Sequence, residues 1–180
     1  MKATGIVRKI DDLGRVVIPK EIRRTLKIRE SDPLEIFTEK DGSMIFKKYS
    51  PMGDMQETAA QLCDAVYAVT GKPVAVSDRD SVIAAAGVHG RELLDKQNSE
   101  ALDRIIAGRE PYSHASESPA LPLLDGADRF HITAAVPILN QGDLMGCISL
   151  LGQEQTEPPK DSELLLLLTL SEFLGKQVEP

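Results

Sequence analysis

Residues 4–26 read TGIVRKIDDLGRVVIPKEIRRTL, and this stretch decides the fold of the first part of the chain. Side chains alternate between two faces from Gly5 to Ile10, which predicts a β-strand. Asp11 to Gly14 has the composition of a turn. The β-branched run from Val16 to Ile18 predicts a second strand that is buried on both sides. The chain therefore begins with a strand, a turn and a strand.

A short helix and a hairpin complete this segment. Pro19 suits the first position of a helix, so we expect one to two helical turns from Lys20 to Leu26. Ile22 and Leu26 are four residues apart and should both face inward. Further along, Asp41-Gly42 separates two apolar runs and predicts a β-hairpin. The two predicted strands are Leu34–Phe37 and Met44–Lys47.

The charge of the chain is divided unevenly. The 180 residues carry a net charge of −7, but residues 1–50 contain 12 Lys and Arg against 8 Asp and Glu, whereas residues 51–180 contain 9 against 20. Charges screen one another over about 8 Å at physiological salt, so a distant acidic domain cannot cancel a basic surface that touches phosphate. Guanidinium groups suit phosphate oxygens and guanine edges. The sequence predicts a surface for double-stranded DNA formed by Arg8, Lys9, Arg15, Arg23 and Arg24.

The first fifty residues offer few large apolar side chains, and a domain of this size buries too little surface to be stable alone. We therefore expect a dimer through residues 1–50, with strands that interlock between two chains. The basic residues also have a simpler interpretation. Asp11, Asp12 and Glu21 could pair several of the cations and leave a solvated face without a partner.

Residues 4–26 resemble the DNA-binding domain of the AbrB-type transition-state regulators. The resemblance is long and specific. It implies a swapped-hairpin β-barrel formed by two chains, with Arg8, Arg15, Arg23 and Arg24 in contact with DNA. It also implies binding that follows the shape and flexibility of the duplex more than a tight consensus. The activity that it implies is both activation and repression of sporulation genes.

A domain boundary is predicted between Tyr49 and Asp54, where the sign of the charge changes and Pro and Gly interrupt the chain. We expect a DNA-binding domain at residues 1–50, a linker at 51–53 and a second domain at 54–180. The second domain alternates helices and strands in an order typical of an α+β fold.

The expected helices of the second domain have clear end signals. A helix from Asp54 to Thr70 should stop at Gly71, a helix capped by Asn98 should run to about Ala107, and a final helix from Ser162 to Gln177 should be capped by Asp161. The first of these carries an apolar stripe of Met55, Ala59, Leu62, Cys63, Val66 and Val69. The expected strand pairs are Val74–Ser77 with Val82–Ala86, and His131–Leu139 with Leu144–Leu151.

Several segments of this second domain resemble a GAF domain. The resemblance implies a central antiparallel sheet, helices at the ends that make dimer contacts, and often a small-molecule pocket under the middle segment. We expect such a pocket, for a molecule of unknown identity, to be lined by residues 88–128. His89, His114 and His131 are scattered and are not expected to bind a metal. The resembling segments are Val74–Asp80, Ala86-Gly87, Ala135–Ile138, Gly142 and Leu144–Leu150.

The final helix is apolar around most of its circumference. One side can cover the sheet of its own domain, but the rest needs another partner. We expect a helical bundle with a second copy, made by residues 162–177 together with 54–70. With a second contact through residues 1–50, closed assembly gives a dimer or a tetramer, and we favour the tetramer. The large apolar residues of this final helix are Leu164–Leu168, Leu170, Phe173 and Leu174.

No apolar run reaches the roughly 18 residues needed to span a bilayer, and no apolar signal-peptide core follows Met1. We expect a cytoplasmic protein without a membrane partner. The two cysteines, Cys63 and Cys147, stand alone in the sequence. They predict neither a disulfide scaffold nor a metal site, and no cofactor is indicated.

Two other classes of protein stay open. Some GAF-fold proteins are methionine sulfoxide reductases that use neighbouring cysteines. Here Cys63 lies on the apolar stripe of a helix and Cys147 in a buried strand, so both resemble packing residues and we expect neither an enzyme nor catalytic residues. Toxin-binding antitoxins contain related swapped-hairpin barrels. They usually carry a disordered C-terminal tail, whereas residues 54–180 are apolar enough to fold.

Overall fold

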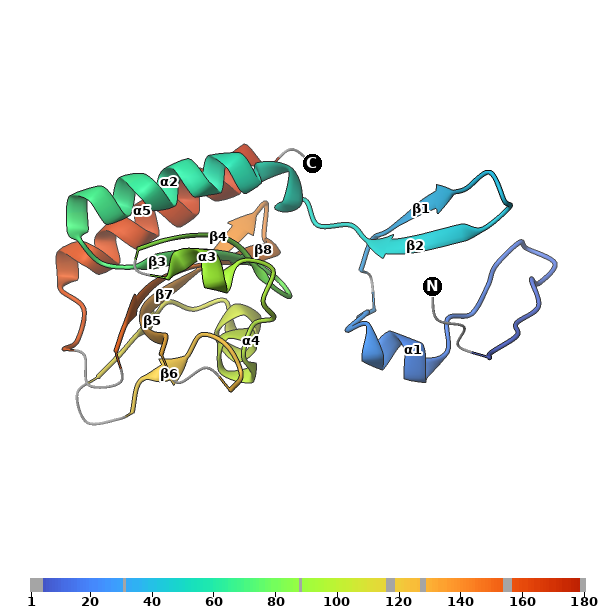
Figure 1. The fold of residues 1–180 in the computed structure, drawn as a ribbon, viewed down its shortest axis with the longest axis horizontal. Coiled ribbons are helices and arrows are strands. Elements are labelled where there is room, and N and C mark those ends of the chain that lie inside the picture. Colours follow the sequence, from blue (N-terminus) through green and yellow to red (C-terminus); the bar gives the residue numbers. More distant parts are fainter. Residues whose placement is uncertain are drawn as a thin grey trace. The chain divides into compact units, whose positions relative to one another are not determined.

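The computed structural model describes residues 5–30, 32–87, 89–115, 119–126, 129–153 and 157–178. The chain divides into two compact units, Met1–Tyr49 and Ser50–Pro180 (Figure 1).

The first unit contains one short helix and one hairpin. Helix α1 spans Lys20–Thr25, and the antiparallel strands β1 (Leu34–Thr38) and β2 (Met44–Lys48) place Ile36 opposite Phe46. The predicted helix and hairpin are therefore confirmed. Pro19 was expected at the first helical position but lies just before the helix, with an extended ψ of 147°.

The strands predicted at Gly5–Ile10 and Val16–Ile18 do not form within the single chain. Only the turn between them is made, where the Asp11 N–H donates to the Arg15 carbonyl at 3.1 Å. A strand needs a neighbouring strand whose N–H and C=O groups pair with its own, and in the described part of the chain no second strand lies along these segments. The expected burial is not reached within the single chain either, where Val17 and Leu26 are 72% and 54% exposed.

The second unit is an α+β domain with a six-stranded antiparallel sheet in the order β4-β3-β8-β7-β5, in which β6 also pairs with β7. Both predicted strand pairs are confirmed, and each forms an antiparallel hairpin. The strands are β3 (Val74–Asp78), β4 (Val82–Ala86), β5 (Tyr112–Ser113), β6 (Leu121–Pro122), β7 (His131–Asn140) and β8 (Asp143–Gly152).

Helices cover both faces of this sheet. Helices α2 (Gln56–Thr70) and α5 (Asp161–Gln177) lie side by side on one face (Figure 1), and their buried side chains share a core with Val74 and Val76 of β3. The short helix α3 (Gly90–Leu93) and helix α4 (Glu100–Gly108) pack on the other face, in a second core that contains Ala75. Alternate residues of one strand thus enter different cores, as the pleat of a strand requires.

The start of the first of these helices differs from the prediction, whereas its end does not. The 3₁₀ turn η1 (Gly53–Met55) precedes α2, so the α-helix begins two residues after Asp54. Gly71 ends α2 in the left-handed conformation, with φ 68°, as predicted. Val69 was assigned to the apolar stripe but is 85% exposed. A step of three residues from Val66 turns a side chain by about 60° and carries Val69 off the buried side.

The N-terminal caps of the other two long helices each fall one residue from the prediction. Ser99, not Asn98, caps α4: its hydroxyl accepts from the Leu102 N–H at 3.0 Å and donates to the Pro122 carbonyl at 2.6 Å. The Asn98 amide instead donates to the Asp78 carbonyl at 3.1 Å. Asp161 is already helical, and the Glu163 carboxylate accepts from the N–H of Lys160 at 2.9 Å.

Within the described ranges, no helix is both long and apolar enough to cross a membrane.

Gly175 should tolerate no side chain, because a Cβ there would overlap the carbonyl oxygen of Leu139 in β7. We expect Gly175→Ala to lower the free energy of unfolding by about 1–3 kcal/mol, as overpacking does, even though Ala favours a helix. Gly108→Ala in α4 is the control, because open space surrounds that position. Urea unfolding at one protein concentration measures both, and equal stabilities would contradict the close contact.

Candidate nucleic-acid interface

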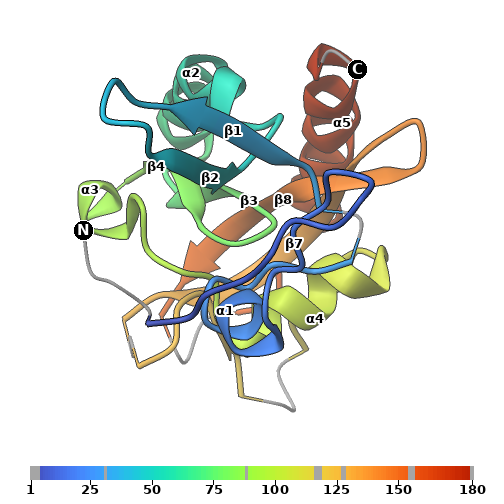
Figure 2. The ribbon, with the colours of Figure 1, turned by 90° about the vertical axis from the view of Figure 1, so that its right-hand side faces the viewer.

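The five predicted DNA-binding residues lie on three elements of the first unit. Arg8 and Lys9 are in the first extended segment, Arg15 follows the turn, and Arg23 and Arg24 occupy the last turn of α1. Figure 2 shows the long loop of residues 5–18 leading into α1. All five side chains belong to exposed residues. Their convergence into one basic ridge stays a prediction.

Asp11 both builds the turn and holds Arg15. Its Oδ1 atom accepts from the N–H groups of Leu13 and Arg15 at 3.0 and 2.7 Å. Its Oδ2 atom accepts from the Arg15 Nε at 2.8 Å in an exposed ion pair. The hydrogen bond from the Arg15 N–H, followed by the one from its guanidinium, lowers the pKa of Asp11. The turn therefore fixes the direction of Arg15 before any ligand arrives.

The other four cations are available for a ligand. Among the described residues, the side chains of Arg8, Lys9, Arg23 and Arg24 have no hydrogen-bond or ion-pair partner. Of the three carboxylates that could have neutralised this surface, only Asp11 pairs with one of its cations in the described part of the chain. A fully self-paired basic face is therefore not what the structure contains.

Sequence reasoning missed one further cation on the same helix. Lys20 begins α1 and is exposed, three and four residues before Arg23 and Arg24. This spacing places side chains on one face of a helix, so it was the signal that could have identified Lys20. Other basic residues of the unit are engaged. Lys48 pairs with Asp32 at 3.1 Å, and the Lys47 ammonium lies 4.8 Å from the centre of the Phe37 ring.

The first unit exposes most of its apolar side chains. Among its described residues, only Pro19 is buried. An isolated soluble unit of this kind would leave its apolar surface in water. The most exposed of these apolar residues is Val7, at 86%. The exposed set comprises Ile6, Val7, Ile10, Leu13, Val16, Val17, Leu26, Ile36, Phe37, Met44, Phe46 and Tyr49.

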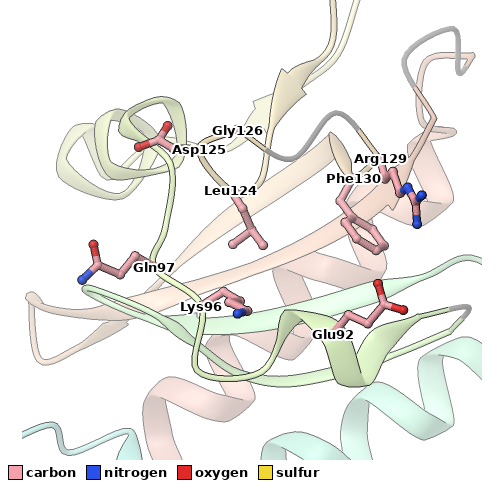
Figure 3. Close-up of a pocket in the computed structure, with 8 residues that line it drawn as sticks. All are labelled: Glu92, Lys96, Gln97, Leu124, Asp125, Gly126, Arg129 and Phe130. Carbon is pink, nitrogen blue, oxygen red and sulfur yellow. The ribbon is translucent and has the colours of Figure 1, made fainter.

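The second unit contains a cavity of about 660 Å³ (Figure 3). Two parts of the chain line it. The first comprises Glu92 of α3 with Lys96 and Gln97, which follow that helix, and the second comprises Leu124, Asp125, Gly126, Arg129 and Phe130, which precede β7. The sequence predicted a pocket lined by residues 88–128, and the structure places the cavity there, with Arg129 and Phe130 in addition. The histidines are dispersed: His89 pairs with Glu92 at 2.8 Å, whereas His114 and His131 are buried.

Two family models match successive parts of the chain, and they meet at residue 54, close to the division between the two compact units. Residues 54–179 match the family model described as "Stage V sporulation protein T C-terminal, transcription factor". Residues 7–54 match the model described as "Antidote-toxin recognition MazE, bacterial antitoxin".

Two curated relatives come from Bacillus subtilis (strain 168). The chain is 44% identical to stage V sporulation protein T over 180 residues, which cover 99% of each chain. It is 53% identical to the transition state regulatory protein AbrB over 74 residues, which cover 41% of this chain and 76% of AbrB. The predicted resemblance to the AbrB-type regulators is confirmed by these matches.

Solved structures identify the fold of the second unit. The GAF domain of a phosphoenolpyruvate-protein phosphotransferase from Coxiella burnetii superposes with a TM-score of 0.54 at 12% identity, covering 69% of this chain and 82% of that one. A type II free methionine-R-sulfoxide reductase from Thermoplasma acidophilum gives 0.52 at 11% identity, covering 72% and 95%. The predicted fold class, an AbrB-type domain followed by a GAF-type α+β domain, is confirmed.

The Asp11 turn makes a prediction about pH. Asp11 should titrate below its ordinary pKa of 3.8, because its bonds to Arg15 stabilise the carboxylate. Above pH 3.8 the carboxylate is charged and the turn is intact. The turn loosens only as the pH falls through the lowered pKa. In Arg15→Gln the pKa should rise only part of the way, since the stronger bond from the backbone N–H remains. Carboxyl ¹³C NMR titration measures both values, and an Asp11 pKa above 3.8 in the wild type would refute the turn.

Proposed function

Since the chain belongs to the family of stage V sporulation protein T, we propose that it is a transcription regulator that binds double-stranded DNA through residues 1–50 and activates or represses sporulation genes in the cytoplasm. The observation that carries this proposal is the set of exposed cations without partners on the first unit, in an otherwise acidic chain. The identity with AbrB over this part of the chain supports it. Residues 54–180 form the sensor and oligomerisation domain.

The DNA contacts in this proposal are Arg8, Lys9, Arg15, Arg23 and Arg24. Binding should tolerate many sequences, because residues 1–50 contain neither Asn nor Gln, the usual readers of adenine. Arginine and lysine contacts to phosphate position a protein on the duplex without reading its sequence. The regulator therefore follows duplex shape more than base identity.

The functional form of the first unit is a dimer. A second chain would supply the missing strand partners for residues 5–10 and 16–18 and would cover the exposed apolar side chains. The short extended segments and their alternating pattern support a barrel of interlocked hairpins. In such a barrel the arginines of both chains lie on one assembly, and the number of phosphates contacted doubles.

Affinity for DNA should fall steeply with salt. If a dimer neutralises about 4–8 phosphates, the logarithm of the binding constant should fall against the logarithm of salt concentration with a slope of about −4 to −7. A filter-binding titration from low to physiological salt measures the slope. A value near zero would remove the electrostatic basis of the proposal.

Arg23→Ala with Arg24→Ala should abolish detectable DNA binding and leave the dimer folded, because both side chains are exposed and support no other residue. The matched control is Arg104→Ala with Lys176→Ala, which removes two cations from exposed ion pairs of the second unit. Gel-shift and circular dichroism experiments compare the two. Undiminished binding by the first variant would place the DNA surface elsewhere.

Further assembly should use the second unit. The outer surface of α5 exposes Leu165, Leu168 and Phe173, beside the exposed face of α2. Within one chain, the inner side of α5 already covers the sheet through Leu167 and Leu174. A bundle of these helices with those of a second copy covers the remaining apolar surface. With dimer contacts at both ends of the chain, the closed assembly is a tetramer.

Leu165→Glu with Phe173→Glu should reduce the full-length assembly from tetramer to dimer, because it places two charges in the apolar contact. Arg104→Glu in α4 changes the net charge by the same amount on the opposite side of the sheet and should leave the tetramer intact. Sedimentation velocity at micromolar concentration measures the assembly. A double variant that sediments like the wild type would show that α5 makes no such contact.

The two alternative classes are less well supported. Cys63 and Cys147 are fully buried in different cores, and burial raises the pKa of each thiol to about 12. Protonated, separated thiols do not suit a reductase that uses neighbouring cysteines. The antitoxin family model matches residues 7–54. The rest of the chain contains a complete α+β domain, however, and not the disordered tail that antitoxins usually carry.

A further inference from the structure

The cavity of the second unit has charged walls and an apolar lining. Glu92 and Lys96 lie on one wall, and Asp125, Arg129 and the ring of Phe130 come from the other (Figure 3). Its volume of about 660 Å³ is within the range of pockets that hold small metabolites. The two carboxylates and two cations would give a neutral site if all four faced the ligand on equal terms.

The carboxylates are already engaged. Glu92 accepts from the His89 ring at 2.8 Å, and Asp125 accepts from the N–H of Glu100 at 3.3 Å, at the start of α4. The two cations of the cavity are not engaged in this way. Among the described residues, the side chains of Lys96 and Arg129 have no hydrogen-bond or ion-pair partner. Of the four charged side chains at the cavity, the two without a partner are therefore the cations.

An apolar part of a ligand also has a place in this cavity. Leu124 is buried, and Phe130 is half-buried and packed against the same core. In Figure 3 both side chains point into the space between the two lining segments. Such a wall contributes affinity by removing apolar ligand surface from water.

The backbone that carries these side chains is held in place without a ligand. The carbonyl of Lys96 accepts from the Val82 N–H at 2.9 Å, and Gln97 forms a bridge with Ser81. The next residue, Asn98, forms a bridge with Leu124. The backbone at Lys96, Gln97 and Leu124 is thus fixed before a ligand binds, which limits the backbone entropy lost on binding.

We propose that this cavity binds a small organic anion, with its carboxylate or phosphate at Lys96 or at Arg129 and its apolar part against Leu124 and Phe130, whose ring lies between the two cations in Figure 3. The proposal rests on the proposed function, because it names the chemical class of the signal that the second domain senses. A cationic ligand of the same shape meets two free cations and carboxylates that are already bonded. It should therefore bind more weakly than the anion.

The test uses full-length protein and three probes of one shape. 4-(Trifluoromethyl)phenylacetate is the anion, its amide is the neutral probe, and 4-(trifluoromethyl)phenethylamine is the cation. Broadening of the ¹⁹F line measures weak binding to a large assembly. For a ligand of this size we expect a dissociation constant of about 1 mM for the anion. The amide and the amine should bind at least about tenfold more weakly, because each loses the charge-assisted bonds.

Lys96→Gln with Arg129→Gln should weaken binding of the anion by about tenfold or more and leave the amide unchanged. Arg104→Gln with Lys176→Gln removes the same charge outside the cavity and should have no effect. Thermal melts confirm that all variants are folded. Equal binding of the three probes, unchanged binding of the anion by the first variant, or no binding of the anion by the wild type at 20 times the expected constant would each overturn the proposal.

A gel shift on the same samples without probe separates this proposal from the function on which it rests. DNA binding with no anion binding would overturn only the assignment of the cavity. Selective anion binding that Lys96 and Arg129 control, without DNA binding, would support the cavity and overturn the proposed regulator.

Discussion

Extended backbone without a pairing partner is the constraint on which the first unit depends. In the described part of the chain, the backbone of Val7–Ile10, Val16 and Val17 makes no hydrogen bond, and the side chains around it are exposed. Apolar surface in contact with water is unfavourable, and an exposed strand edge offers its N–H and C=O groups for pairing. In the proposed dimer, strands from a second chain would cover that surface and pair with those groups. The same association would gather basic residues from two chains.

The second unit pairs its strands and buries its apolar side chains within one chain. Its sheet is covered on one face by α2 and α5 and on the other by α3 and α4, and the cores on the two faces draw alternate residues from the same strands. What remains exposed is a limited apolar surface on α5. In the proposed assembly, association would therefore complete the fold of the first unit, whereas in the second it would add to a domain that is already complete.

Local patterns predicted the second unit well. Two strand pairs, three long helices and the stop at Gly71 followed from periodicity and turn residues. The helix starts were displaced by one or two residues, because a cap depends on a particular hydrogen bond. Ser99 and Asn98 are both good caps by type, and only the fold shows that Asn98 is used by Asp78. The strands predicted within residues 5–18 do not form in the single chain, because a strand needs a pairing partner that a local pattern does not reveal. For the same reason, the five cations could be identified by type and exposure but not their relative positions.

The open apolar surface of the first unit has a consequence for gene dosage. In the proposed function the dimer is the form that binds DNA. While most chains are monomeric, the amount of that dimer rises with the square of the chain concentration, so a doubling of synthesis gives about four times as much binding-competent protein. A gradual increase in expression is thereby converted into a steep increase in promoter occupancy. A regulator with a self-sufficient DNA-binding domain has no such threshold, and its response to dosage is proportional.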